Sequence, residues 1–166
     1  MASLPDMWGT GYFKANACDY CTDVTTELAD ISLGDAWLPE YKPDGLGNSV
    51  IITRTKLADK LVIDGVLSGK LNVKTIGVDA IIESQRGSYT HRHDGLYFRV
   101  KWMNRGRLLP YIRKRVFRKT LPLNSLIQIN RRLTRVKSLH IWRKVGNATL
   151  FDKRMNKYLF FLKYLT

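Results

Sequence analysis

The sharpest chemical feature of the sequence is a pair of cysteines, Cys18 and Cys21, separated by two residues. Two thiolates at this spacing can bind one metal ion or cluster iron, because a turn between them lets both sulfurs point at one centre. The same spacing also suits a thiol–disulfide redox pair, and a structural or incidental role is equally open. A zinc or iron–sulfur centre needs four ligands, for which His91 and His93 are weak further candidates.

Carboxylates and a glycine-bearing loop form a second group of candidate residues. Asp30 and Asp35 flank an expected strand, where a carboxylate could hydrogen-bond a ribityl, ribose or amide edge. The segment 44–49 leads into the next strand, and its glycines would allow the backbone to approach a ligand closely. Solvated turn residues and a plain connecting turn are the alternative interpretations of both features.

The elements expected to position these residues alternate between strand and helix. Hydrophobic patterning predicts strands over 29–34, 49–54 and 71–76, a helix over 56–67, a short helix over 78–85 and a loop over 86–95. The order strand, helix, strand predicts a β-α-β unit. The expected fold class is therefore α/β or α+β, with a mixed sheet core.

The C-terminal part of the chain is helical by pattern. Apolar residues recur at helical spacing after Pro110 and in two longer stripes. The stripes are Leu126, Ile129, Leu133 and Val136, followed by Phe151, Met155, Tyr158, Leu162 and Leu165. We expect basic amphipathic helices here. Their stripes either pack on the α/β core or dock on another surface.

The charge of the chain is distributed unevenly. The formal net charge is +14 over 166 residues, but residues 1–95 carry −4 and residues 96–166 carry +18, with Asp152 as the single acid of the second part. Such a basic segment suits an anionic membrane surface or another polyanion. Two cysteines exclude a disulfide-stapled mini-domain, and the sequence holds no run of 18 apolar residues and no signal-peptide pattern. We therefore expect a cytoplasmic location with reduced thiols.

Taken together, the motifs of residues 10–100 resemble the C-terminal domain of the coenzyme F420 hydrogenase/dehydrogenase beta subunit family. The pattern is Cys-x-x-Cys, then Glu-x-Ala-Asp-Ile, a glycine at the strand end, and Gly-x-Ser before a β-branched strand that ends in Arg-Thr. It comprises Cys18, Cys21, Glu27, Ala29, Asp30, Gly34, Gly47, Ser49, Arg54 and Thr55. The sequence at residues 34–41 resembles bacterial relatives associated with surface-polysaccharide genes more than it resembles the methanogen hydrogenase subunits.

The resemblance implies part of an iron–sulfur flavoprotein oxidoreductase. Such a protein passes electrons between a [4Fe–4S] cluster, FAD and a two-electron acceptor such as a deazaflavin. Cys18 and Cys21 would be two of the cluster ligands. The cofactor-binding candidates are Asp30, Asp35, Asp44, Gly47, Asn48, Ser49 and Arg54, and no catalytic residue is assigned.

The resemblance also implies a division of the chain and a need for partners. Residues 1–106 correspond to the family's C-terminal domain, and residues 107–166 form a basic helical extension. Family members are generally longer, so a missing N-terminal half or a partner subunit would supply further cluster ligands, and the chain alone would be inactive.

Three further expectations concern partners and the alternative function. A redox partner and an anionic membrane surface are expected, the latter at the inner face of the membrane, whereas nucleic acid is not. The alternative function is a non-catalytic basic module that binds a membrane or polyanion.

Overall fold

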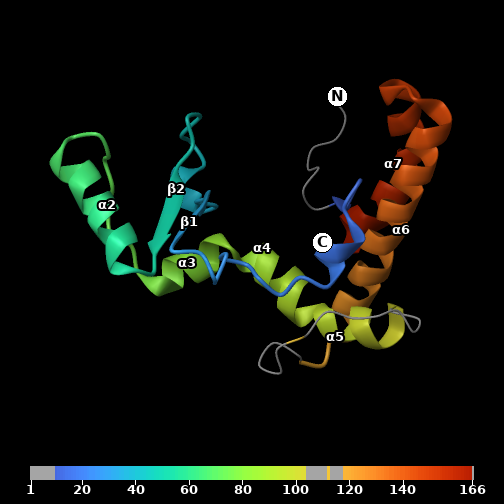
Figure 1. Cartoon of the computed structure of the whole chain (residues 1–166). Helices are drawn as coiled ribbons and strands as arrows, with labels where there is room; N and C mark the ends of the chain where they lie inside the picture. Colours follow the sequence, from blue (N-terminus) through green and yellow to red (C-terminus); the bar gives the residue numbers. More distant parts are fainter. Residues whose placement is uncertain (1–9, 104–111, 113–117, 166) are drawn as a thin grey trace. The chain divides into compact units, whose positions relative to one another are not determined.

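The computed structural model describes residues 10–103, 112 and 118–165, with side chains up to residue 160 (Figure 1). Packing divides the chain into two compact units. Unit 1 comprises residues 1–22 and 92–166, and unit 2 comprises residues 23–91. Each unit is described by itself below. The boundary predicted after residue 106 rests on sequence resemblance and charge, and it stays a prediction.

Unit 2 is built around a two-stranded antiparallel hairpin. Strand β1 (Ile31–Asp35) pairs with strand β2 (Ser49–Thr53) in a register that sets Ile31 opposite Thr53 and Asp35 opposite Ser49. The strands lie within two residues of their predicted bounds, because β-branched residues crowd β2 and the segment between them is rich in Pro and Gly.

The helices of unit 2 follow directly after the hairpin. Helix α2 (Lys56–Leu67) has the predicted bounds, and the Thr55 side chain caps it by accepting a hydrogen bond from the Ala58 N–H at 3.4 Å. Helix α3 (Val78–Ser84) also falls where a short helix was expected. Mixed α and β content with C-terminal helices is therefore confirmed.

The β-α-β unit, in contrast, is not formed in the described residues. The segment 71–76, predicted as a third strand, has no regular structure. Its start folds back on α2, where the N–H groups of Lys70 and Leu71 donate to the Gly65 carbonyl at 2.9 and 3.0 Å. A strand needs a neighbouring edge for its ladder, and in the described residues β1 and β2 pair only with each other.

Residues 86–103 are helical, although a loop was expected over 86–95. Helix α4 (Arg86–Tyr89) continues through a π-helical turn at Thr90–Asp94, helix α5 (Leu96–Phe98) and a second π-helical turn at Arg99–Met103. Glycines and polar residues in this stretch hid the helix from pattern analysis, since no apolar stripe marks it.

Unit 1 contains a helical hairpin that packs against the start of the described chain. Helix α6 (Pro122–Val145) ends at Gly146, which adopts the left-handed conformation with φ +54°, and helix α7 (Ala148–Leu165) follows (Figure 1). The side-chain oxygen of Asn147 accepts from the Leu150 N–H at 3.0 Å at the start of α7. The helical pattern predicted after Pro110 lies outside the described residues, apart from residue 112.

The core of unit 1 joins α7 to α6 and to residues 12 and 13. It consists of Tyr12, Ile141, Phe151 and Met155, and the ring of Phe13 stacks on that of Phe151. The side chain of Met155 is fully buried. The described members of the α7 stripe therefore pack inward, as an amphipathic helix requires.

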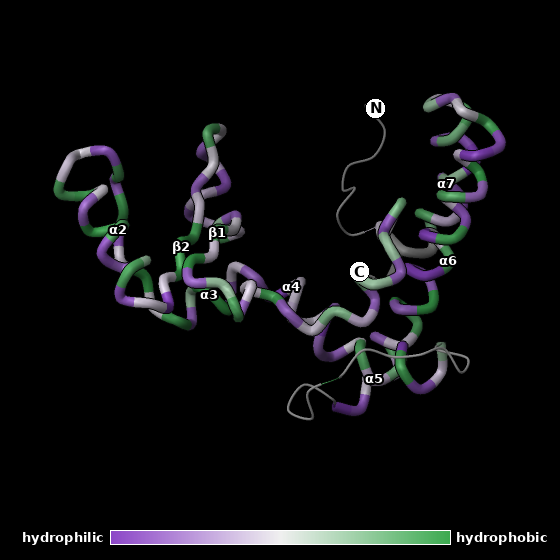
Figure 2. The backbone as a smooth tube through the Cα atoms, viewed as in Figure 1, coloured by the Kyte–Doolittle hydropathy of each residue, from purple (hydrophilic) through white to green (hydrophobic). Residues whose placement is uncertain are grey.

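Helix α6 buries the opposite face from the one that its sequence predicts. The apolar stripe is exposed, with Leu126, Ile129, Leu133 and Val136 at 52, 47, 41 and 50% exposure (Figure 2 colours the chain by hydropathy). The buried residues of α6 are Gln128, Thr134, Arg135, Ser138 and Ile141. Of the two alternatives for this stripe, packing on the core is not what the structure has, because polar contacts determine which face turns inward.

Unit 2 likewise leaves much apolar surface uncovered. Helix α2 buries only Ala58, whereas Leu57, Leu61 and Leu67 are 70, 62 and 80% exposed. On β1, Ser32 is buried while Leu33 is 68% exposed. Exposed apolar residues on this scale are typical of an interaction surface.

Candidate functional site

The cysteine pair lies in a short ordered segment of unit 1. Cys18 belongs to the 3-10 turn Asn16–Asp19, and Cys21 follows shortly after it. The Cys18 N–H donates to the Ala15 carbonyl at 3.2 Å and the Tyr20 N–H donates to the Ala17 carbonyl at 3.1 Å. Both cysteines carry thiols that are not joined in a disulfide, and both are partly exposed. Both side chains are therefore reduced thiols, from which metal binding or thiol–disulfide exchange can start.

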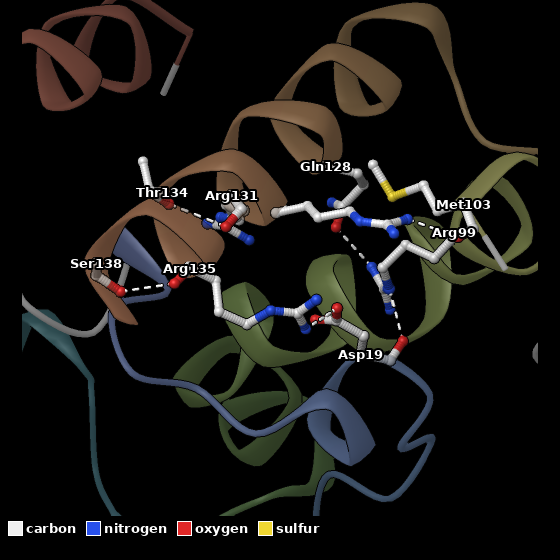
Figure 3. Close-up of polar contacts among 9 residues, drawn as sticks. Asp19, Arg99, Met103, Gln128, Arg131, Thr134, Arg135 and Ser138 are labelled. Carbon is white, nitrogen blue, oxygen red and sulfur yellow. Dashed lines mark hydrogen bonds and ion pairs between the residues drawn. The ribbon is translucent and has the colours of Figure 1, made fainter. Parts of the chain in front are cut away.

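Asp19, between the two cysteines in sequence, anchors this segment to α6. Its carboxylate forms an ion pair with the guanidinium of Arg135, and the two side chains are 15% and 7% exposed (Figure 3). Removal of one partner from a buried ion pair leaves the other charge uncompensated and destabilises the fold. The pair therefore ties the conformation of residues 18–21 to helix α6.

Arg99 holds the same turn from the second π-helical turn. Its Nε–H donates to the Asp19 carbonyl at 2.7 Å, and its NH1 donates to the side-chain oxygen of Gln128 at 2.6 Å (Figure 3). Arg99 is only 2% exposed, and its NH2 group has no partner among the described residues. Burial lowers the pKa of Arg99 to about 10, and the charge of Asp19 opposes that shift.

Gln128 completes this buried network from α6. Its amide nitrogen donates to the Asn124 side-chain oxygen at 2.7 Å while its oxygen accepts from Arg99. Gly95 is needed for this approach, because a Cβ there would lie 2.5 Å from the Gln128 nitrogen and 2.6 Å from Arg99 NH1. The network thus has no room for a larger residue at position 95.

Two more hydrogen bonds attach the segment that precedes the cysteines to helix α6. The hydroxyl of Thr134 donates to the Thr10 carbonyl at 2.5 Å, and the Phe13 N–H donates to the Ser138 hydroxyl at 3.1 Å. These contacts explain why α6 turns a polar face inward. That face binds backbone groups of residues 10–13, and buried backbone groups must be hydrogen-bonded.

Cations surround the sulfur atoms. Arg92 NH1 lies 3.7 Å from the Cys21 sulfur. Burial lowers the pKa of the Lys14 ammonium, and the nearby Cys18 and Asp19 oppose that shift. Cationic side chains of unit 1 therefore lie beside the cysteine segment.

The histidines do not join the cysteines in a metal site. The ring nitrogen Nε2 of His93 lies 2.8 Å from the Thr22 carbonyl oxygen, and His91 is 8% exposed. In the described part of the chain, no group of three or more His, Cys, Asp or Glu side chains could hold a metal ion. Cys18 and Cys21 could supply two thiolates to a four-ligand centre, and the described residues do not complete it.

The predicted cofactor residues lie in unit 2, at two ends of one hairpin. The tip holds Asp35 and the loop 44–49, where the Asp44 carboxylate accepts from the Leu46 N–H at 3.0 Å and from the Asn48 side chain at 2.9 Å. Gly47 has φ +78°, and nothing lies within 4 Å of the position of a Cβ. The tip is exposed and its backbone is held in one turn by Asp44.

Asp30 and Arg54 lie at the other end of the hairpin. The Arg54 N–H donates to the Asp30 carbonyl at 2.8 Å. The Arg54 guanidinium donates to the carbonyls of Ala29 and Thr25 at 3.0 and 2.7 Å and to the Ser32 hydroxyl at 2.6 Å. These contacts make Arg54 a clamp for residues 25–32. The register therefore brings Asp35 and Ser49 together and separates them from Asp30 and Arg54.

Sequence analysis missed the residues that hold the cysteine segment. Arg99, Arg135 and Gln128 lie 80 or more residues away from the segment in sequence, so no local motif connects them. One signal was present: α6 carries polar residues at helical spacing on the face opposite its apolar stripe. That signal does not distinguish a buried polar face from a solvated one, because amphipathic surface helices also carry a polar face opposite their apolar stripe.

The comparisons with known proteins support the class of protein that these motifs indicate. Residues 2–78, a little under half of the chain, match the family model that describes the C terminus of the coenzyme F420 hydrogenase/dehydrogenase beta subunit. The matched segment carries both cysteines and the whole hairpin. No curated protein and no solved structure matches the chain.

Proposed function

We propose that the chain is part of an iron–sulfur flavoprotein oxidoreductase that passes electrons between a [4Fe–4S] cluster, FAD and a two-electron acceptor such as a deazaflavin. The family match over residues 2–78 carries the proposal. The redox chemistry belongs to the cofactors, whereas this chain contributes ligands, orientation and exclusion of water. Cys18 and Cys21 would bind cluster iron, and the remaining thiolates would come from a partner polypeptide.

The contacts around the cysteines suit that role. A cluster site fixes thiolates at set distances, and nearby hydrogen-bond donors and charges tune its potential. Arg135 and Arg99 hold Asp19 between the cysteines, and Arg92 lies beside the Cys21 sulfur. The net positive surroundings would favour the reduced state of a negatively charged cluster.

The flavin would lie at the hairpin tip. Asp35, Asp44, Gly47, Asn48 and Ser49 are gathered there, and the open space beside Gly47 lets a ligand approach the backbone. We assign Asp30 and Arg54 a positioning role through the clamp on residues 25–32, in place of direct contact with the cofactor.

A partner polypeptide is part of the proposal. The exposed leucines of α2 and the exposed outer face of β1 need a cover. A partner polypeptide would supply that cover together with further cluster ligands. A redox partner would then exchange electrons with the completed protein, and the chain alone would be inactive.

Anaerobic purification of the tagged full chain from its own host tests the proposal. The complex should show the visible absorbance of both a cluster and a flavin and about four irons, the content of a [4Fe–4S] cluster. The Cys18→Ser, Cys21→Ser double variant should lose the iron. A complex with flavin but unchanged iron in that variant would contradict the role of these cysteines, and a colourless complex would contradict the proposal as a whole.

A second candidate function is peripheral binding to an anionic membrane. It is favoured by one observation, the exposed apolar stripe on the basic helix α6. No helix among the described residues has the length and apolar character needed to span a bilayer. We propose a cytoplasmic protein that docks on the inner membrane face through α6 and α7. The link to surface-polysaccharide genes also stays a prediction.

A further inference from the structure

The hairpin of α6 and α7 encloses a groove with a strongly basic lining. The groove has a volume of about 670 Å³. Cations enter it from both helices: Lys137 and Lys144 from α6, and Lys153, Arg154 and Lys157 from α7. Asp152, the single acid beyond residue 95, is not among the lining residues, which include no Asp or Glu. Among the described residues that line the groove, no carboxylate therefore balances the positive charge.

Part of the groove lining is apolar. Ile141 and Leu150 contribute aliphatic surface, and Tyr158 contributes an aromatic ring. Lysine heads beside this apolar lining form a site for a ligand that carries both anionic groups and hydrocarbon. Lysine also binds phosphate as a point charge from several directions, so the site tolerates the varied orientations of a headgroup.

The groove continues the exposed apolar stripe of α6. Leu133, Lys137 and Lys144 share one face of the helix, because steps of three or four residues return to the same side. Along this face, exposed apolar residues occupy the N-terminal half and cations occupy the C-terminal half. A surface of this composition matches the boundary between hydrocarbon and phosphate in a bilayer.

We propose that the α6–α7 groove binds the phosphate group of an anionic phospholipid while the stripe of Leu126, Ile129, Leu133 and Val136 contacts the acyl region. The inference rests on the proposed membrane docking and names the site and the ligand chemistry for it. Charge complementarity and the adjoining apolar stripe identify the occupant. An acidic polypeptide would match the lysines and leave the stripe uncovered.

Vesicle co-sedimentation of the full chain tests the assignment. The probes are vesicles of phosphatidylcholine alone and vesicles that also contain phosphatidylglycerol. The groove variant is Lys144→Gln, Lys153→Gln and Lys157→Gln. Its matched control is Lys56→Gln, Lys70→Gln and Lys74→Gln, which removes the same charge from exposed lysines of unit 2. Circular dichroism checks that both keep their helices.

Wild type and control should bind the anionic vesicles with equal affinity. The groove variant should bind on the order of 100-fold more weakly, since each lysine near an anionic surface contributes about a fivefold change. Equal losses in the groove variant and the control would overturn the site, because net charge alone would then explain binding. Equal affinity of the groove variant and wild type would overturn it as well.

Two further experiments distinguish failure of the phosphate site in the groove from failure of the membrane docking on which the inference rests. The Leu126→Ser, Leu133→Ser variant should lose vesicle binding and keep the binding of inorganic pyrophosphate, measured by calorimetry. If wild type binds no vesicle but binds pyrophosphate, and the groove variant does not, membrane docking fails and the ligand is a free phosphate compound. If polyglutamate binds in the groove and neither vesicles nor pyrophosphate do, the occupant is an acidic polypeptide and the lipid assignment is wrong.

Discussion

Single side chains of unit 1 determine the conformation of the cysteine segment. Asp19 accepts hydrogen bonds through both its backbone carbonyl and its carboxylate, from Arg99 and Arg135 respectively. Both arginines belong to the strongly basic part of the sequence, which suggested contacts with a polyanion. Their burial shows that part of this charge serves the interior of the protein.

Replacement of Arg135 tests the ion pair with Asp19. Arg135→Met should lower the free energy of unfolding by about 3–5 kcal/mol, because the Asp19 carboxylate loses its buried partner. Denaturant unfolding measures the loss, and the reaction of Cys18 and Cys21 with a thiol reagent should become faster. Arg143→Met, at an exposed position of α6, should change stability by no more than about 0.5 kcal/mol. Equal stabilities of the two variants would contradict the structural role of the pair.

Gly95→Ala tests the close approach of Gln128 and Arg99. The added methyl group would lie 2.5 Å from the Gln128 nitrogen, so the network must shift at a cost of about 1–3 kcal/mol. Gly87→Ala is the control, because nothing lies within 4 Å of a Cβ there. Thermal unfolding should show a lower Tm for the first variant alone, and a Tm unchanged in both would mean that the network adapts freely.

Tyr12 carries a buried hydroxyl without a hydrogen-bond partner in the described residues. Burial raises the pKa of Tyr12, and the charge of Asp152 adds to the shift. Because the folded pKa lies above the unfolded value, the stability of the wild type should fall as the pH rises above about 10, where the phenol of the unfolded chain ionises. At pH 7 the unpartnered hydroxyl is a burial cost, so the free energy of unfolding of Tyr12→Phe should match or exceed that of the wild type by about 1 kcal/mol.

The advantage of Tyr12→Phe should grow in unfolding experiments above about pH 10, where the phenol of the unfolded wild type ionises. Tyr158→Phe, which removes the hydroxyl of a part-buried tyrosine, provides the comparison. A Tyr12→Phe variant that is less stable than wild type at pH 7 would show that the hydroxyl has a stabilising partner.

The two C-terminal helices differ in which face they bury, although their sequence patterns are alike. Helix α7 packs its apolar stripe against Ile141 of α6 and Tyr12. Helix α6 turns Thr134 and Ser138 toward the backbone of residues 10–13. The hydrogen-bonding needs of that segment therefore decide the orientation of α6, and its apolar stripe remains outside.

Alanine substitutions in the two stripes should separate them. Met155→Ala should cost about 2–5 kcal/mol, because the side chain is fully buried and its removal leaves a cavity. Leu126→Ala, at a side chain 52% exposed, should cost less than about 0.5 kcal/mol. Chemical denaturation measures both values. Similar losses would mean that the α6 stripe packs inward after all.

At the scale of the whole molecule, unit 1 is assembled from two separated parts of the chain. Residues 10–22 take their polar and apolar contacts from residues 92–103 and from α6 and α7. Compactness in this unit therefore depends on segments far apart in the sequence, and the helical extension is part of the fold that holds the cysteines.

Removal of residues 107–166 should disrupt that unit. The 1–106 chain loses Arg135, Thr134 and Ser138, so the cysteine segment has no helix to pack against. Thiol-reagent kinetics should show Cys18 and Cys21 reacting as fast in the truncated chain as in denaturant, while the full chain reacts more slowly. Equal protection in both chains would show that α6 and α7 are dispensable for the segment.

The sequence by itself determined the local elements and the family. The β-branched residues of β2, the Thr55 cap of α2 and the apolar spacing of α7 act within a few residues, so pattern analysis placed them well. The joint motif from Cys18 to Thr55 identified the family that the comparison confirmed over residues 2–78.

Only the tertiary structure decided which segments pair and which helix faces are buried. No ladder partner exists for 71–77 in the described residues, so an alternating pattern there does not become a strand. The buried face of α6 depends on backbone groups of residues 10–13, and Arg99 and Arg135 find Asp19 from far along the chain. Local patterns cannot report such contacts, because buried hydrogen bonds and ion pairs join groups that only the folded chain brings together.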